Sequence, residues 1–151
     1  MNKTIEILRQ PRIKVLDQIA TLSIEQLNHI PAGFNNNIIW NLGHVVAAQQ
    51  GVCYARAGLN KVVSDEFFMS FKPDTGPERF YDAAEVDSIK SLMFSTLDQL
   101  AADLEKDIFG DYKTWTTRYG FEITNIDDAV RFLPFHDGLH AGYIMSLRKL
   151  V

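Results

Sequence analysis

The chain contains 151 residues, of which 46% are hydrophobic and 23% charged, and its net charge is −4. A chain of this length can bury a core of its own, so we predict a single domain over residues 1–151. The acidic balance speaks against nucleic-acid binding, which requires clustered basic residues. The single cysteine, Cys53, cannot form an intramolecular disulfide, so the fold does not depend on an oxidising compartment.

The N-terminal segment carries Arg9, Arg12 and Lys14 and has no continuous apolar stretch of the kind found in signal peptides. The most apolar region, residues 38–59, is interrupted by polar residues and is typical of a buried helix rather than a membrane span. We therefore expect a cytoplasmic protein with no membrane or nucleic-acid partner.

The first predicted element is a helix. Apolar residues recur at helical spacing over residues 5–22, and Pro11 is either a kink or part of the first turn of the main helix. Ser23 and Gln26 then form a capping-box pattern, which predicts a short helical turn before the next loop.

A second helix is predicted from about Ile38 to Ala57. The side chains of residues 35–37 are suited to cap its free amides, and Gly58 is a typical stop. Residues 64–66 indicate the start of a single-turn helix, and residues 72–77 are typical of an irregular crossover.

A third helix is predicted to start at Asp82, with Glu85 as its capping partner, and to end at Gly110. Aromatic and β-branched residues over 111–124 indicate a short extended or hairpin segment, and a fourth helix follows over about 126–150. The fold class expected is all-α: a four-helix bundle with a long crossover between helices two and three and a short extended segment before helix four.

Three of the four histidines fall on helix faces that the periodicity turns inward. His136 and His140 are four residues apart on the apolar stripe of the fourth helix, and His44 lies on a similar stripe of the second. Two imidazoles at this spacing can bind one metal ion without distorting the helix, and His44 would supply a third ligand. Such a site leaves a position open for water, substrate or thiolate, as in catalytic metal sites.

Imidazole is of intermediate softness, so zinc or nickel is the expected divalent ion, with iron(II) or manganese as alternatives. Small residues beside the histidines would leave volume for the ion: Gly43, Ala47, Ala48, Gly51, Gly138, Ala141 and Gly142. Candidates to line the open face are Trp40, Tyr54 and Tyr143. The alternative interpretation is that the histidines are core residues and the small residues allow close helix packing. His29, beside Pro31 in a predicted loop, is assigned no function.

The same residues disfavour other kinds of site. Residues 136–140 resemble the zinc-protease pattern His-Glu-x-x-His, but Asp137 stands where the general-base glutamate is expected. No histidine follows a glutamate by three residues, as a di-iron bundle requires. Cys53 is predicted to be a small buried hydrophobic residue rather than a nucleophile.

Two segments of the chain resemble the signature segments of the DinB-like superfamily of small bacterial four-helix-bundle proteins. They are NNNIIWNLGH at residues 35–44 and FHDGLHAGYI at residues 135–144. Residues 116–120 also resemble a segment common in one branch of that superfamily. The resemblance implies a divalent ion bound by one histidine of helix two and two of helix four, which are His44, His136 and His140 in this sequence.

Asp137 stands where many members carry glutamate, and we expect it to contact the metal ligands without binding the ion itself. Some relatives are S-transferases or isomerases that use low-molecular-weight thiols, others are described only as metal-dependent hydrolases, and dimers are common. We therefore expect a homodimeric, metal-dependent transferase or hydrolase acting on a small molecule, with a small thiol as a partner. The sequence does not identify a catalytic side chain. The alternative is a non-catalytic, metal-binding or stress-associated bundle.

Overall fold

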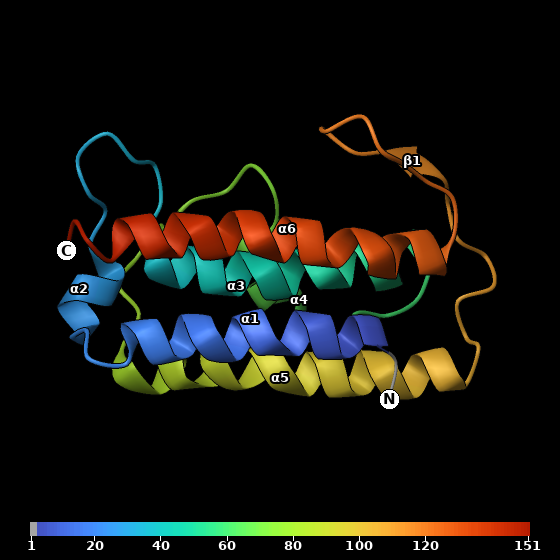
Figure 1. Cartoon of the computed structure of the whole chain (residues 1–151), viewed down its shortest axis with the longest axis horizontal. Helices are drawn as coiled ribbons and strands as arrows, with labels where there is room; N and C mark the ends of the chain where they lie inside the picture. The colour runs from blue at the N-terminus through green and yellow to red at the C-terminus, as the bar shows by residue number, and fades with distance from the viewer. Residues whose placement is uncertain (1–2) are drawn as a thin grey trace.

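The computed structural model describes residues 3–151, and its long helices lie side by side along the long axis of the molecule (Figure 1). The helices are α1 (Lys3–Ile19), α2 (Ile24–Asn28), α3 (Ile38–Gln49), α4 (Asp65–Phe71), α5 (Ala83–Glu105) and α6 (Ile126–Leu147). A short hairpin joins β1 (Trp115–Thr116) to β2 (Glu122–Ile123). The predicted all-α class is therefore confirmed. No described helix is both long enough and apolar enough to cross a membrane.

The second predicted helix is a continuous helical run with three hydrogen-bonding patterns. The Asn37 side chain caps it by accepting a hydrogen bond from the backbone N–H of Trp40 (2.8 Å). After α3 come a π-helical turn, η1 (Gln50–Tyr54), and a 3₁₀ turn, η2 (Ala55–Ala57), before Gly58 ends the run at φ +69°. Every residue of α3 is buried because it packs against α4, α5 and α6. The π-helical turn was not predicted.

Two predicted helix ends are wrong. α5 begins at the predicted capping box, but it ends at Glu105 and not at Gly110, since the chain turns at Asp107 with φ +52°. α6 ends at Leu147, three residues before the predicted end. Pro11 lies inside α1 on its exposed face and not in the first turn.

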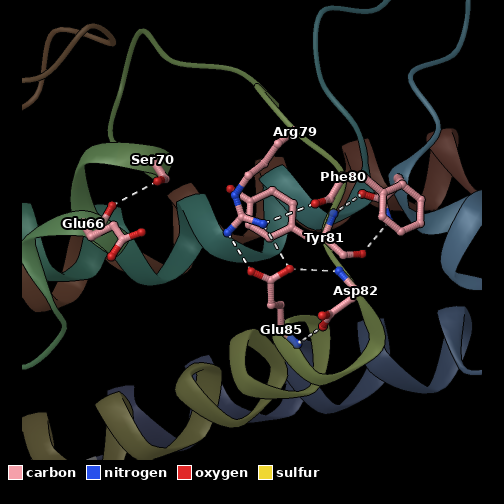
Figure 2. Close-up of polar contacts among 8 residues, drawn as sticks. Glu66, Ser70, Arg79, Phe80, Tyr81, Asp82 and Glu85 are labelled. Atoms are coloured by element: carbon pink, nitrogen blue, oxygen red, sulfur yellow. Dashed lines mark hydrogen bonds and ion pairs between the residues drawn. The ribbon is translucent and has the colours of Figure 1, made fainter.

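The crossover between η2 and α5 is held by polar contacts at the start of α5 (Figure 2). Arg79 forms an ion pair with Glu85 (2.7 Å), and its guanidinium lies over the ring of Tyr81. Glu85 also accepts a hydrogen bond from the backbone N–H of Asp82. α4 lies within this crossover and starts after the predicted cap, Ser64, so the crossover brings a short helix beside α3 and buries its last residue, Phe71.

The predicted hairpin is present, with Trp115 opposite Ile123 and a turn at Gly120 (φ +81°). Tyr119 and Phe121 lie in the turn and are exposed, and both rings pack against Phe135 of α6. The hairpin is thereby attached to α6 (Figure 1).

The core forms two hydrophobic clusters, which occupy opposite halves of α1, α5, α6 and the continuous run of α3, η1 and η2. Between the two clusters, each helix carries a buried polar residue: Arg12 in α1, Gln49 in α3, Thr96 in α5 and Asp137 in α6. Gln49 donates a hydrogen bond to the Thr96 carbonyl (2.9 Å), and Arg12 pairs with Asp137 (2.8 Å). We call these four residues the polar layer, and the histidines lie beside it on α3 and α6.

Candidate metal centre

The structure brings together the three histidines predicted to form a site. His44 comes from α3, and His136 and His140 come from α6. Each offers one ring nitrogen, and the three nitrogens lie within 4.8 Å of one another. The ring centroids are 4.6 Å apart for His136–His140, 4.7 Å for His44–His140 and 5.2 Å for His44–His136. This convergence follows from the packing of α3 against α6 and the four-residue spacing on α6.

The ring of His44 is fixed by the C-terminal end of α4. Its Nδ1 lies 2.7 Å from the carbonyl oxygen of Phe71, which can only accept, so Nδ1 carries the proton and Nε2 has the free lone pair. The Phe71 ring approaches α3 so closely that a Cβ at residue 43 would overlap it, which is why glycine is required there. Trp40 stacks on a face of the imidazole, with the ring centroids 4.6 Å apart and the ring planes at 13° to each other.

His140 is fixed by an asparagine whose role the sequence analysis missed. The Asn41 amide nitrogen donates to the Asn36 side chain (3.0 Å) and to the Asn37 carbonyl (2.8 Å). Its oxygen therefore faces Nδ1 of His140, at 2.8 Å, and accepts that proton. Nε2 of His140 is left free, as on His44. Metal-binding histidines commonly use their second nitrogen in this way, which fixes both tautomer and orientation.

His136 is backed by a buried ion pair. Its Nδ1 has no hydrogen-bond partner among the described residues, and the nearest carboxylate oxygen of Asp137 is 4.0 Å away. The other oxygen of Asp137 accepts from Nε of Arg12 (2.8 Å), and Arg12 also donates to the Met93 carbonyl (2.6 Å). Arg12 and Asp137 are only 2% and 4% exposed. Asp137 thus lies beside His136, and Arg12 was not foreseen as its partner.

Burial sets the charge state of these groups. It lowers the pKa of His44 to about 4. Burial, together with the charges of the neighbouring imidazoles, lowers the pKa of His140 to about 3. Both rings are therefore neutral near pH 7, which is the form that binds metal. Burial is the largest single influence on Asp137 and alone would raise its pKa, but the charge and hydrogen bond of Arg12, together with His136, outweigh it and hold the pKa below its usual value, so the carboxyl is ionised.

The three histidines line a cavity of about 530 Å³, a volume typical of small-molecule sites. Aromatic side chains form much of its wall: Trp40, Phe68, Trp115, Tyr119, Phe132 and Tyr143. Of the small residues, Ala47, Ala48 and Gly51 line the cavity as predicted. The hairpin supplies part of the wall, which the sequence did not indicate.

Several other sequence expectations are corrected or confirmed here. Gly43 packs against Phe71, and Gly138, Ala141 and Gly142 lie outside the cavity, so the small residues of α6 do not make room at the histidines. Tyr54 also lies outside it and donates to Asp103. Cys53 is fully buried, and burial raises its pKa to about 12, which confirms that it is a core residue. His29 is exposed at the end of α2.

These residues fit a divalent metal ion. Neutral imidazoles converge from two helices, and two of them keep Nε2 free because Nδ1 is engaged by an acceptor. The cavity leaves room on their open side, as in catalytic sites with three protein ligands.

The fold and the site thus define a helical protein with a three-histidine cluster shared by two adjacent helices. Residues 8–144 match the family model of the DinB superfamily, and the chain belongs to that superfamily. The resemblance seen in the two histidine-containing segments is thereby confirmed. None of the curated proteins compared with the chain matches it.

Proposed function

We propose that the chain is a metal-dependent enzyme in which His44, His136 and His140 hold a divalent ion, with zinc or nickel as the first candidates. The observation that carries the proposal is that the three imidazoles line a large cavity and are not enclosed on all sides by core. We also infer that α1, α3 with η1, α5 and α6 are the four helices of the bundle expected from the sequence.

A divalent ion bound there would lower the pKa of a thiol or a water molecule, so that the anionic nucleophile exists near neutral pH. The chain's own residues contribute positioning. The Phe71 carbonyl and the Asn41 amide hold two imidazoles in one tautomer and one orientation. The aromatic walls hold an apolar electrophile beside the histidines and exclude water from it.

Thiol transfer is favoured over hydrolysis by the charges in the cavity. Among the described residues that line it, only Asp74 carries a carboxylate, and Arg118 pairs with it. Asp137 lies outside the cavity and is paired with Arg12. No free carboxylate of the described wall is thus placed to act as a general base on water. We therefore propose transfer of a small thiol to a small electrophile. The thiolate sulfur forms a bond to the electrophilic carbon, the bond to the leaving group breaks and releases that group as an anion (chloride for monochlorobimane), and the thiol proton passes to solvent.

The test combines metal analysis with a conjugation assay. Elemental mass spectrometry should find about one ion per wild-type chain and none in the His136→Ala/His140→Ala variant. The wild-type protein should also accelerate conjugation of small thiols to monochlorobimane. The control is His29→Ala, which removes an exposed histidine outside the site. A wild-type rate no higher than that of a variant without the three histidines would contradict the proposed activity.

The second candidate is a non-catalytic, metal-binding bundle. It is favoured by one observation: His44 is only 6% exposed and lies next to the buried polar layer, so ion binding would contribute to folding stability. A large fall in melting temperature on adding a chelator, with no turnover of any thiol or ester, would support this candidate over the enzyme.

A further inference from the structure

The cavity has a positive balance of charge in a chain whose net charge is −4. Apart from the histidines, its charged lining residues are Arg56, Arg118 and Asp74. Arg118 donates to both carboxylate oxygens of Asp74, each at 2.8 Å, so these two charges offset each other. Arg56 has no ion-pair partner within the described residues 3–151. One uncompensated cation therefore lies in the cavity wall.

Arg56 is held in place by the first strand of the hairpin and by the segment that precedes it. Its guanidinium lies over the ring of Trp115, 4.7 Å from the centroid. The Trp115 indole N–H donates to the Tyr112 hydroxyl (3.0 Å), which in turn donates to the Val52 carbonyl (2.8 Å). The Arg56 carbonyl accepts from the backbone N–H of Lys113 (2.8 Å). The cation is thus preorganised on a fixed aromatic platform, which reduces the entropy lost when it binds an anion.

Arg56 lies at a distance from the histidines along the same helical run. It follows His44 by twelve residues through α3, η1 and η2. At a rise of 1.5 Å per residue, their backbones are roughly 18 Å apart. Both residues nevertheless line one cavity, and the wall between them is formed by small and aromatic side chains such as Ala48, Gly51 and Phe68. A ligand that contacts both ends must be elongated, with an apolar middle.

We propose that Arg56, on its Trp115 platform, binds the terminal carboxylate or phosphate of an elongated substrate whose other end lies at the three histidines. This inference extends the proposed function by naming the substrate class, and it rests on that function only for the reacting end. Arg56 would then determine specificity without taking part in the reaction.

The anion site can be tested without metal and without turnover. Octanoate, octyl phosphate and 1-octanol are titrated into chelator-treated protein by isothermal titration calorimetry. We expect both anions to bind at least about tenfold more tightly than the alcohol, because a hydrogen bond between two charged groups is stronger than one to a neutral hydroxyl. Arg56→Gln should remove that difference and leave 1-octanol binding unchanged. Arg131→Gln, which removes an exposed arginine of α6 outside the cavity, is the matched control.

The outcomes separate this proposal from the catalytic one. Equal affinity of the wild-type chain for the anions and the alcohol would overturn the proposed anion site. An affinity difference between anions and alcohol that is kept in Arg56→Gln would also overturn it. If that difference is lost in Arg118→Gln but kept in Arg56→Gln, the anion is bound by Arg118 instead. A difference that persists in a variant lacking all three histidines would support the anion site even if no metal or conjugation activity were found. Thermal melting of each variant identifies any that fail to fold.

Discussion

Replacing Arg12 with methionine should be one of the most destabilising single substitutions in this chain. Methionine keeps much of the apolar length of arginine but leaves the Asp137 carboxylate without a counter-ion at a position that is 4% exposed. One of the two Asp137 oxygens already lacks a hydrogen-bond partner among the described residues, so little else would compensate the charge. Breaking a buried ion pair in this way costs about 3–5 kcal/mol, a large part of the 5–15 kcal/mol typical of a domain.

An exposed ion pair of the same chain provides the matched control. Arg79 and Glu85 approach to 2.7 Å (Figure 2), close to the 2.8 Å between Arg12 and Asp137, but their side chains are 54% and 37% exposed. Arg79→Met should therefore cost roughly 1 kcal/mol or less. Because an apolar pair of similar volume is tolerated where half an ion pair is not, Arg12→Met/Asp137→Leu should recover most of the loss.

The assay is equilibrium urea denaturation of metal-free protein, followed by circular dichroism at pH 7 and pH 5. In Arg12→Met, burial is no longer opposed by the Arg12 charge, so it raises the pKa of the folded Asp137 carboxyl above its unfolded value. The loss of unfolding free energy relative to the wild-type chain is then largest at pH 7. It becomes smaller toward pH 5, because the buried carboxyl takes up a proton. Two results would refute the reasoning. One is a loss of unfolding free energy in Arg12→Met that is no greater than in Arg79→Met, and the other is a double variant that is less stable than Arg12→Met.

Four further outcomes are expected. Asn41→Ala should weaken zinc binding about 10–100-fold in competition with a chromophoric chelator, because His140 loses the acceptor that orients it, whereas the exposed Asn60→Ala should not. The metal-free chain should lose stability as pH falls from about 6.5 toward 4, because unfolded His44 takes up a proton that the folded ring, with its pKa of about 4, does not. In His44→Gln the urea midpoint should fall less steeply with pH, and the remaining slope comes from His140, whose pKa in the folded chain is about 3. Cys53 should resist iodoacetamide until the chain is unfolded in urea, and rapid labelling of native protein would contradict its burial. Light scattering should give twice the monomer mass, as the family resemblance implies and as the exposed apolar side chains of α6 favour: Phe135, Tyr143 and Met145.

The helix starts were predictable because they depend on residues close together in the sequence. Asn37, Ser64 and Asp82 each accept a hydrogen bond from a backbone N–H three residues on, so the pattern that indicates the cap also contains its partner. The end of α5 was not predictable by the same rule. Asp107 adopts a left-handed conformation that glycine favours, and Gly110 was therefore the wrong marker.

The histidine cluster was predictable because helix periodicity alone places His136 and His140 on one face. The groups that fix the cluster were not, since they come from distant parts of the chain. The Phe71 carbonyl lies 27 residues from His44, Asn41 lies 99 residues from His140, and Arg12 lies 125 residues from Asp137. One local feature could have indicated the role of Asn41. It is a polar residue one turn before His44, and it is buried at a position where core packing alone would favour an apolar side chain.

The polar layer connects the folding of the chain to its candidate site. A buried ion pair contributes little net stability compared with apolar residues of the same volume, so packing alone does not account for Arg12 and Asp137. Their position next to His136 offers a reason: the pair keeps an anion beside the Nδ1 of this ligand, where it would stabilise the bound form. Arg12→Met/Asp137→Leu separates the two roles. It should fold but bind zinc more weakly than the wild-type chain, and wild-type affinity in that variant would mean that the pair serves the fold alone.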